Sequence, residues 1–293
     1  MNIVIVGQGA IGSALAARCE IQGLAYKVMG RTSTLQCIEW IAYQGERLAF
    51  LPESLEPHEL KGNELIILPL KAYQILPAVT ALKPYLTEQT MLLLHNGMGT
   101  QSEVEALLPD LPLALGITRM AVLKQDTQVT ETGLGGSDLG WALAPANKAN
   151  REQAEHLLSS ILAPCQWHTQ IAPLQWAKLA VNAVINPLTA LHNISNGELA
   201  QPQYQAQIQA LNEEIATLMQ GLNIPGAQDI PSRLAQVINA TAANFSSMHQ
   251  DVLHGRPTEI DYINGYLLKE AERLGLALPH HLALWQKIHA RQA

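Results

Sequence analysis

Three polar residues recur at a spacing of four along an otherwise apolar segment, "WAKLAVNAVINPLTALHN" (residues 176–193): Lys178, Asn182 and Asn186. At a helical rotation of about 100° per residue they fall within an arc of about 80°, so one helix face carries an ammonium group and two amides. A solvated polar stripe is the alternative, but the neighbouring residues are nearly all apolar. Pro187 would remove one helical hydrogen bond and bend the helix there. We therefore interpret this face as the wall of a binding or catalytic site.

A second group of polar residues lies in the last quarter of the chain. "GRPTEIDYINGYLL" predicts a helix with Pro257 and Glu259 in its first turn. An acid in that turn is commonly a partner of the helix dipole, so this role and a role in a site both stay open. Asn244 and Ser247 lie in "ANFSSMHQD", at the end of the preceding predicted helix, where a helix-end role is equally open.

The start of the chain carries the pattern GxGxxG directly after an apolar run. "VIVGQGAIGSALA" places Gly7, Gly9 and Gly12 between a predicted strand and a predicted helix. The first glycine permits a tight turn, the second lets the backbone approach a pyrophosphate, and the third lets helix and strand pack closely. Free N–H groups at the helix start then face the phosphates. We predict a dinucleotide site formed by Gly7, Gln8, Gly9, Ala10, Ile11 and Gly12 rather than a merely structural turn.

The end of the second predicted strand indicates which dinucleotide binds. An NAD site usually has an acid there to bond the ribose 2′-hydroxyl, but "YKVMGRTS" has none. Arg31 can meet a 2′-phosphate, with Lys27, Thr32 and Ser33 as helpers, although a solvated surface arginine is the alternative. This favours NADPH/NADP+ over NAD as the cofactor.

Two further segments follow predicted strands, where ligands of open α/β sheets bind. "LPLKAYQ" places Lys71 just past one strand, and "LLLHNGMGT" places His95 and Asn96 past the next. Gly97 and Gly99 allow close approach of the backbone. Each of these residues is also an ordinary turn residue, so both interpretations stay open.

The elements that must position these residues change type along the chain. Apolar runs such as "NIVIVG", "AYKVMG", "NELIILPLK", "TMLLLHNG" and "LPLALGITRM" alternate with helical patterns, which predicts βαβ units and a parallel sheet. "QVTETGLGGSDLGWAL" predicts an antiparallel hairpin. Beyond about residue 170 only helices are expected, over 173–191, 204–221, 230–248 and 258–274. We predict an α/β dinucleotide-binding domain over residues 1–168 and an all-helical substrate and catalytic domain over 169–293.

The bulk properties exclude several classes of protein. A net charge of −7 argues against broad binding to nucleic acid or to an anionic membrane. Three distant cysteines without a CxxC motif suggest reduced thiols, and no metal-binding set is expected. No signal peptide precedes "MNIVIVG" and no stretch is apolar for 18 residues, so we expect a cytoplasmic protein.

These segments resemble the ketopantoate reductase (2-dehydropantoate 2-reductase) family in order across nearly the whole chain. The specific matches are "HNGMGT", "KLAVNAVINPLTA" and "EIDYINGYL", whereas "GITRMAVLKQDTQVTETGLGGSDLG" follows the family only loosely. The resemblance implies a Rossmann domain, a helical domain and an active site in the cleft between them. It also implies NADPH-dependent reduction of 2-dehydropantoate to (R)-pantoate in the pantothenate and coenzyme A pathway.

The resemblance assigns roles to the polar residues at matching positions. Lys178 resembles the catalytic lysine and Glu259 the acid of the second signature. The substrate-binding residues it implies are Asn96, Asn182, Asn186, Asn244 and Ser247, and the cofactor-binding residues beyond the glycine turn are Arg31, Lys71 and Asn96. A related NADP-dependent 2- or 3-hydroxyacid dehydrogenase acting on another branched substrate, and a non-catalytic NADP-sensing regulator, remain as alternatives. A monomer and a homodimer are both compatible with the sequence.

Overall fold

The computed structural model describes residues 1–32 and 34–292, and its contacts divide the chain into two compact units. The first unit comprises Met1–His95 and Thr100–Ile171, and the second comprises Asn96–Gly99 and the chain from Ala172 onward. The sequence predicted that the chain passes from one domain to the other only once, at residue 168. The short segment Asn96–Gly99, which lies with the helices, was not anticipated.

A seven-stranded sheet, sheet A, forms the centre of the first unit in the order β11-β10-β7-β6-β5-β1-β2. Its neighbouring strands are parallel except for β10 and β7. Every residue of β5 and β6 is buried, as strands covered on both faces require. The strands are β1 (Asn2–Val6), β2 (Tyr26–Met29), β5 (Glu64–Leu68), β6 (Thr90–Leu93), β7 (Leu113–Thr118), β10 (Ser137–Leu143) and β11 (Cys165–His168).

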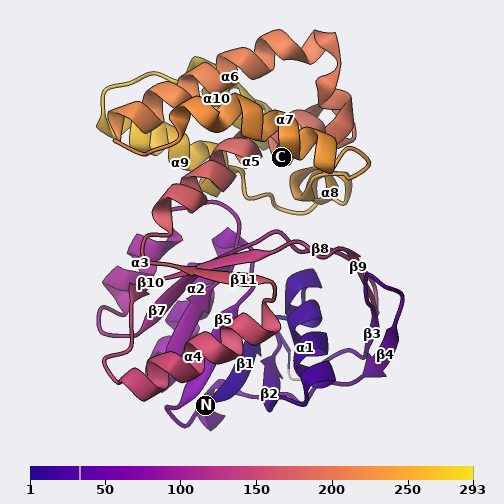
Figure 1. Ribbon diagram of the computed structural model, residues 1–293, viewed down its shortest axis with the longest axis vertical. Helices are drawn as coiled ribbons and strands as arrows, with labels where there is room; N and C mark the ends of the chain where they lie inside the picture. The colour runs from indigo at the N-terminus through magenta and orange to yellow at the C-terminus, as the bar shows by residue number, and fades with distance from the viewer. Residues whose placement is uncertain (33, 293) are drawn as a thin grey trace. The chain divides into compact units, whose positions relative to one another are not determined.

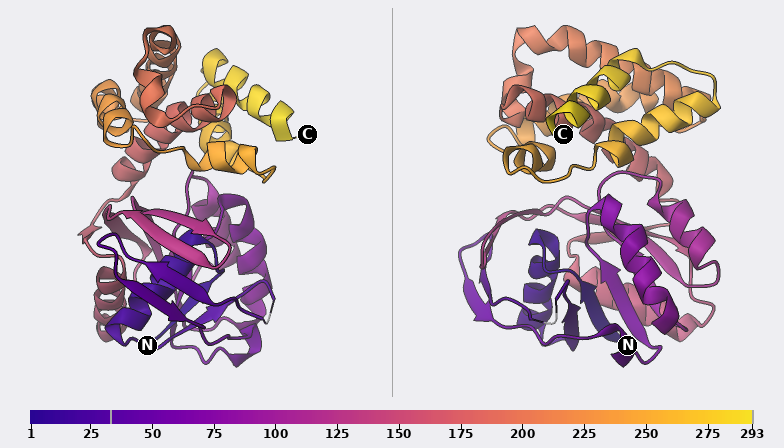
Figure 2. Two further views of the ribbon diagram at one scale, coloured as in Figure 1. Left: turned by 90° about the vertical axis from the view of Figure 1, so that its right-hand side faces the viewer. Right: turned by 180° about the vertical axis from the view of Figure 1, so that it is seen from behind.

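Helices cover both faces of sheet A (Figures 1 and 2). Helices α1 and α4 contact each other on one face, and α2 and α3 contact each other on the opposite face. The helices are α1 (Ala10–Gln22), α2 (Ala72–Leu82), α3 (Thr100–Leu107) and α4 (Lys148–Ile161), with short 3-10 turns η1 (Pro57–Glu59) and η2 (Lys83–Tyr85). The predicted doubly wound α/β class is confirmed.

A second sheet, sheet B, was not expected from the sequence. It has the order β4-β3-β9-β8, from β3 (Ile38–Ile41), β4 (Arg47–Phe50), β8 (Ala121–Gln125) and β9 (Gln128–Gly133). Helix α1 lies between the two sheets and contacts β3, β8 and β9 (Figure 1). This explains why α1 is buried nearly all round and is rich in alanine, since small side chains let both sheets approach.

The hairpin predicted for "QVTETGLGGSDLGWAL" is wrong. The two extended runs exist as β9 and β10, but β9 pairs with β8 and β3, whereas β10 pairs with β7 and β11. The glycines between them carry the chain from sheet B to sheet A. Gly135 has a φ of +53°, and a Cβ there would lie 2.1 Å from the carbonyl oxygen of Arg119.

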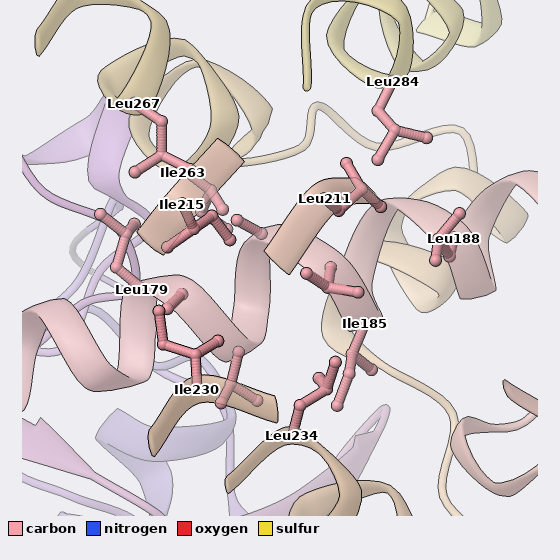
Figure 3. Packing of buried hydrophobic residues seen from close by; sticks show 14 of the residues in the cluster. Leu179, Ile185, Leu188, Leu211, Ile215, Ile230, Leu234, Ile263, Leu267 and Leu284 are labelled. Carbon is pink, nitrogen blue, oxygen red and sulfur yellow. The ribbon is translucent and has the colours of Figure 1, made fainter. Parts of the chain in front are cut away.

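The second unit is helical around one apolar core. Figure 3 shows Leu179, Ile185 and Leu188 of the long helix α5 among side chains from the surrounding helices. The elements are α5 (Ala172–His192), α6 (Pro202–Gly221), α7 (Ile230–Ala240), α8 (Ser247–Leu253), α9 (Ile260–Arg273) and α10 (Pro279–Gln292), with η3 (Asn196–Ala200) and η4 (Ala227–Asp229). The predicted helical character of this part of the chain is confirmed.

Two of the predicted helix boundaries need correction. The single helix expected over 230–248 is two helices, because the chain turns after Ala240 and Ser246 caps α8 by accepting a hydrogen bond from the backbone N–H of His249. Pro257 and Glu259 lie before the first turn of α9 rather than within it, and Glu259 occupies the N-cap position.

Across residues 1–32 and 34–292, no helix is both long enough and apolar enough to cross a membrane.

Candidate active site

The glycine turn lies at the carboxyl end of β1, between the carboxyl ends of its parallel neighbours β2 and β5. The chain runs from β1 to β2 on one side and returns to β5 on the other, so the strand order reverses beside β1. This reversal is where open α/β sheets bind ligands. The structure therefore places Gly7–Gly12 at the expected position in the sheet.

The three glycines of the turn have different surroundings. Gly7 has a φ of +94°, and a Cβ on Gly12 would lie 2.2 Å from the carbonyl oxygen of Gly7. A Cβ on Gly9 would meet no protein atom within 4 Å. Gly7 and Gly12 are thus needed by the fold, whereas the space at Gly9 is open to a ligand.

The start of α1 is suited to an anion. Helix α1 begins at Ala10, and neither a side-chain cap nor an acidic residue in its first turn engages the N–H groups there. Such N–H groups and the positive end of the helix dipole favour a phosphate. The residues present therefore fit the diphosphate of a dinucleotide.

The loop after β2 is tied to the glycine turn by Gln8. Its side-chain amide donates to the carbonyl oxygen of Gln36 at 2.5 Å, and its carbonyl accepts from the N–H of Gln36 at 2.9 Å. The side chain of Gln8 is therefore bonded at Gln36 to the segment after β2, while its backbone belongs to the turn. Arg31 is exposed in this loop.

The predicted helpers of Arg31 have protein partners of their own. Lys27 forms an ion pair with Glu53, which raises the pKa of its ammonium group. The hydroxyl of Thr32 donates to the carbonyl oxygen of Thr34 at 3.2 Å. Ser33, the third predicted helper, lies outside the described residues.

Lys71 and His95 follow β5 and β6 at the same edge of sheet A. Lys71 is the residue before α2, and its backbone N–H donates to the side chain of Gln74 at 3.1 Å. His95 Nε2 lies 2.6 Å from the hydroxyl of Thr100 at the start of α3. The structure thus places Lys71 at the carboxyl edge of sheet A, where open α/β sheets bind ligands.

Helix α5 carries the three predicted polar residues on successive turns. Lys178 and Asn182 are partly exposed, and Asn186 is buried with 6% of its surface exposed. The helix runs continuously from Ala172 to His192 through Pro187. Residues between these positions, such as Leu179 and Ile185, pack into the apolar core (Figure 3). The polar positions therefore lie on a different face of α5 from the core residues.

Asn96 meets Glu259, although 163 residues separate them in the chain. The side-chain amide of Asn96 donates to Glu259 Oε2 at 3.3 Å, and Glu259 is only 3% exposed. The backbone N–H of Met98 donates to the carbonyl oxygen of Tyr262 at 2.8 Å. The segment Asn96–Gly99 is thereby held against the first turn of α9.

Two glycines permit this docking. Gly97 has a φ of +84°, and a Cβ there would lie 2.4 Å from the carbonyl oxygen of Tyr262. Gly99 has a φ of +104° and lies against the ring of Tyr266. Both positions therefore need glycine if Asn96 is to reach Glu259.

Asn244 and Ser247 lie in and just after the connection between α7 and α8, and both are exposed. Between them, the hydroxyl of Ser246 lies 2.8 Å from that of Thr189 on α5. This contact places the connection beside the turn of α5 that carries Asn186. No contact of Asn244 or Ser247 with the other predicted site residues is seen among the described residues.

Sequence reasoning missed the residues that hold the site together. Tyr262 supplies a backbone acceptor to the Asn96–Gly99 segment, and Asn264 donates to the Ala183 carbonyl on α5 at 3.0 Å. Neither side chain forms a spacing pattern with other polar residues. The glycines of "HNGMG" were the available signal that a second backbone approaches closely.

The chain matches two family models that together cover most of its length. Residues 3–142 match the family model described as "Ketopantoate reductase PanE/ApbA", and residues 170–292 match "Ketopantoate reductase PanE/ApbA C terminal".

Individual relatives agree with the family models. A 2-dehydropantoate 2-reductase of Vibrio cholerae is 38% identical, over 98% of this chain and 97% of its own. One of Escherichia coli O157:H7 is 34% identical, over 100% and 96%. The solved structure of a PanE/ApbA family ketopantoate reductase from Ralstonia eutropha JMP134 covers 100% of this chain and 98% of its own, with a TM-score of 0.88 at 20% identity, a likeness of fold.

Proposed function

Since the chain belongs to the ketopantoate reductase family, we propose that it reduces 2-dehydropantoate to (R)-pantoate with NADPH. The observation that carries this proposal is the contact of Asn96 with Glu259, because it joins two of the family's signature segments in one polar site. The alternatives of another hydroxyacid substrate and of a non-catalytic sensor have no observation in their favour.

The first unit would bind the cofactor. The N–H groups of the glycine turn and of the start of α1 would hold the diphosphate, and Lys71 lies at the same edge of the sheet. The exposed guanidinium of Arg31 supports a preference for the 2′-phosphate of NADPH, because the segment after β2 offers no acid for a 2′-hydroxyl.

The second unit would act on the keto acid. NADPH, when bound, supplies a hydride to the C2 carbonyl carbon of the substrate. Lys178 would donate a hydrogen bond, and then a proton, to the carbonyl oxygen as negative charge develops on it. An ammonium group suits this task because its charge opposes the charge that forms.

The neighbouring polar residues would orient the substrate. Asn182 and Asn186 can bond to substrate or to Lys178 without adding a competing charge. Glu259, held by Asn96, can position a substrate hydroxyl or the lysine. Asn244 and Ser247 offer donors for the substrate carboxylate.

The oxidation of NADPH in the presence of 2-dehydropantoate tests this function directly. The wild-type protein should turn over 2-dehydropantoate faster than other branched 2-keto acids. Lys178→Ala should lower kcat by at least about a hundredfold, the scale of a lost proton donor. Lys269→Ala, which changes an exposed lysine of α9, is the matched control and should leave kcat unchanged.

Two outcomes would contradict the proposal. Wild-type turnover by the Lys178 variant would remove that residue from its role. Binding of NADPH without reduction of any keto acid would favour a sensor.

A further inference from the structure

Lys124 reaches the glycine turn from sheet B. It lies on β8, in the part of the chain that follows the family only loosely. Its Nζ atom is 2.5 Å from the carbonyl oxygen of Gln8 and 3.4 Å from the hydroxyl of Ser13. Gln8 belongs to the glycine turn and Ser13 to the first turns of α1, so an ammonium group lies beside the proposed diphosphate site.

The charge of Lys124 is poorly compensated within the protein. Its ammonium group lies next to the positive end of the dipole of α1, whose first turn has no acidic residue. Among the residues that the structure describes, no carboxylate forms an ion pair with it. Burial lowers the pKa of Lys124, which reflects the cost of keeping this charge away from water. The ammonium group of Lys124 and the positive end of the α1 dipole repel each other. A bound anion would attract both and so offset this repulsion.

The contact with Gln8 also fixes the direction of a backbone donor. In a trans peptide the carbonyl of Gln8 and the N–H of Gly9 point in opposite directions. Because Lys124 holds the carbonyl oxygen on its own side, the N–H of Gly9 points away from the lysine. The open space at Gly9 lies on this turn.

We propose that Lys124 is a positioning residue for the cofactor: it orients the Gln8–Gly9 peptide and adds positive potential at the diphosphate. This inference rests on the proposed function, since it requires that the glycine turn binds a dinucleotide. It adds a residue of sheet B to a site otherwise formed by sheet A and α1.

The test is the affinity for NADP+ of the full-length protein, measured by calorimetry with two variants and a control. Lys124→Met removes the charge and the donor and should raise Kd at least about tenfold, a difference of about 1.4 kcal/mol. Lys124→Gln keeps an N–H donor without the charge and should fall between Met and wild type. Lys148→Met, an exposed lysine at the start of α4, should bind as wild type does.

Salt and stability distinguish this role from a merely structural one. The affinity lost in Lys124→Met should shrink as salt rises from about 0.01 M to about 1 M, where the screening length falls from about 30 Å to about 3 Å. Without cofactor, Lys124→Met should melt at the same temperature as wild type or higher, because a poorly compensated charge is removed.

The outcomes separate the two proposals. If wild type binds NADP+ and Lys124→Met binds it equally well, the inference about Lys124 fails while the function stands. If Lys124→Met loses the same affinity for NADP+ at all salt concentrations and also melts at a lower temperature than wild type, the inference is overturned as well. If Lys124→Met does not fold, Lys124→Gln carries the same comparison. If wild type itself does not bind NADP+, the proposed function fails.

Discussion

Asn264 supplies, from α9, the hydrogen bond that Pro187 removes from Ala183 within α5. Pro187 has no N–H, so the carbonyl of Ala183 lacks its helical partner. The side-chain amide of Asn264 donates to this carbonyl oxygen at 3.0 Å and to Nδ1 of His281 at 2.9 Å. Asn264 is fully buried, so water cannot replace it. This hydrogen bond joins α5, which carries Lys178, to α9, which begins directly after Glu259.

Asn264→Leu should lower the free energy of unfolding by about 1–3 kcal/mol, because it leaves the Ala183 carbonyl buried without a donor. Urea unfolding followed by tryptophan fluorescence measures the change. Asn239→Leu, at an exposed position of α7, is the control and should be nearly neutral.

The cause of this loss of stability in Asn264→Leu can be checked by making the same change in a Pro187→Ala background. The alanine in that variant restores a backbone N–H that can reach the Ala183 carbonyl within the helix, so Asn264→Leu should cost less there. An equal cost in both backgrounds would show that Asn264 acts through packing or through His281 alone.

His281 should make the stability of the second unit depend on pH. Its Nε2 faces the carbonyl of Leu211 at 3.2 Å and must donate, so Nδ1 accepts from Asn264 in the neutral ring. Burial lowers the pKa of His281 to about 4. The unfolded chain binds this proton near pH 6.5, about where a free histidine titrates. The contribution of neutral His281 is therefore complete above about pH 6.5 and is lost as the pH falls towards 4.

Urea midpoints measured from pH 7.5 down to pH 4.5 test this dependence, with a slope of up to about 1.4 kcal/mol per pH unit from this group. His281→Gln should show a shallower decline over the same range, since carboxylates contribute to both proteins alike. Parallel curves would mean that His281 takes up its proton equally in the folded and the unfolded protein.

The sequence predicted the elements that are buried on both faces. Strands such as β5 are continuous apolar runs, and the glycines of the turn after β1 mark a strand followed by a helix. Sheet B was not predicted because its strands are short and alternate in burial, as "RLAF" of β4 does. The strands of sheet B also pair across distant segments of the chain, as β3 does with β9. Such pairing leaves no local pattern in the sequence.

Some of the predicted site residues could be grouped from the sequence pattern alone, and others could not. Lys178, Asn182 and Asn186 share a helix, so periodicity was enough to group them. The contact of Asn96 with Glu259 depends on how a loop docks on another helix, and only the resemblance to a family placed both residues in one site. Asn264 and Lys124 act on backbone carbonyls far along the chain, which no sequence spacing encodes.

The glycines of the turn should respond differently to alanine. Gly9→Ala should leave the melting temperature unchanged, because its φ of −73° suits alanine and no protein atom lies near the new methyl group. The methyl would occupy the space proposed for the diphosphate, so the Kd for NADPH should rise at least about tenfold. Gly12→Ala should instead destabilise the fold, since its Cβ would meet the Gly7 carbonyl. Unchanged NADPH affinity in a folded Gly9 variant would place the diphosphate elsewhere.

Arg31 should decide between the two nicotinamide cofactors. A charged hydrogen bond to the 2′-phosphate contributes about 1.5–3 kcal/mol, so Arg31→Ala should raise KM for NADPH by about ten- to a hundredfold. NADH has no 2′-phosphate, and its KM should change little. Arg47→Ala removes an exposed arginine from β4 in the same unit and should alter neither value. Because both cofactors share the diphosphate, an equal rise for the two in Arg31→Ala would mean that this guanidinium acts on the common part of the molecule, and the preference for NADPH would then need another source.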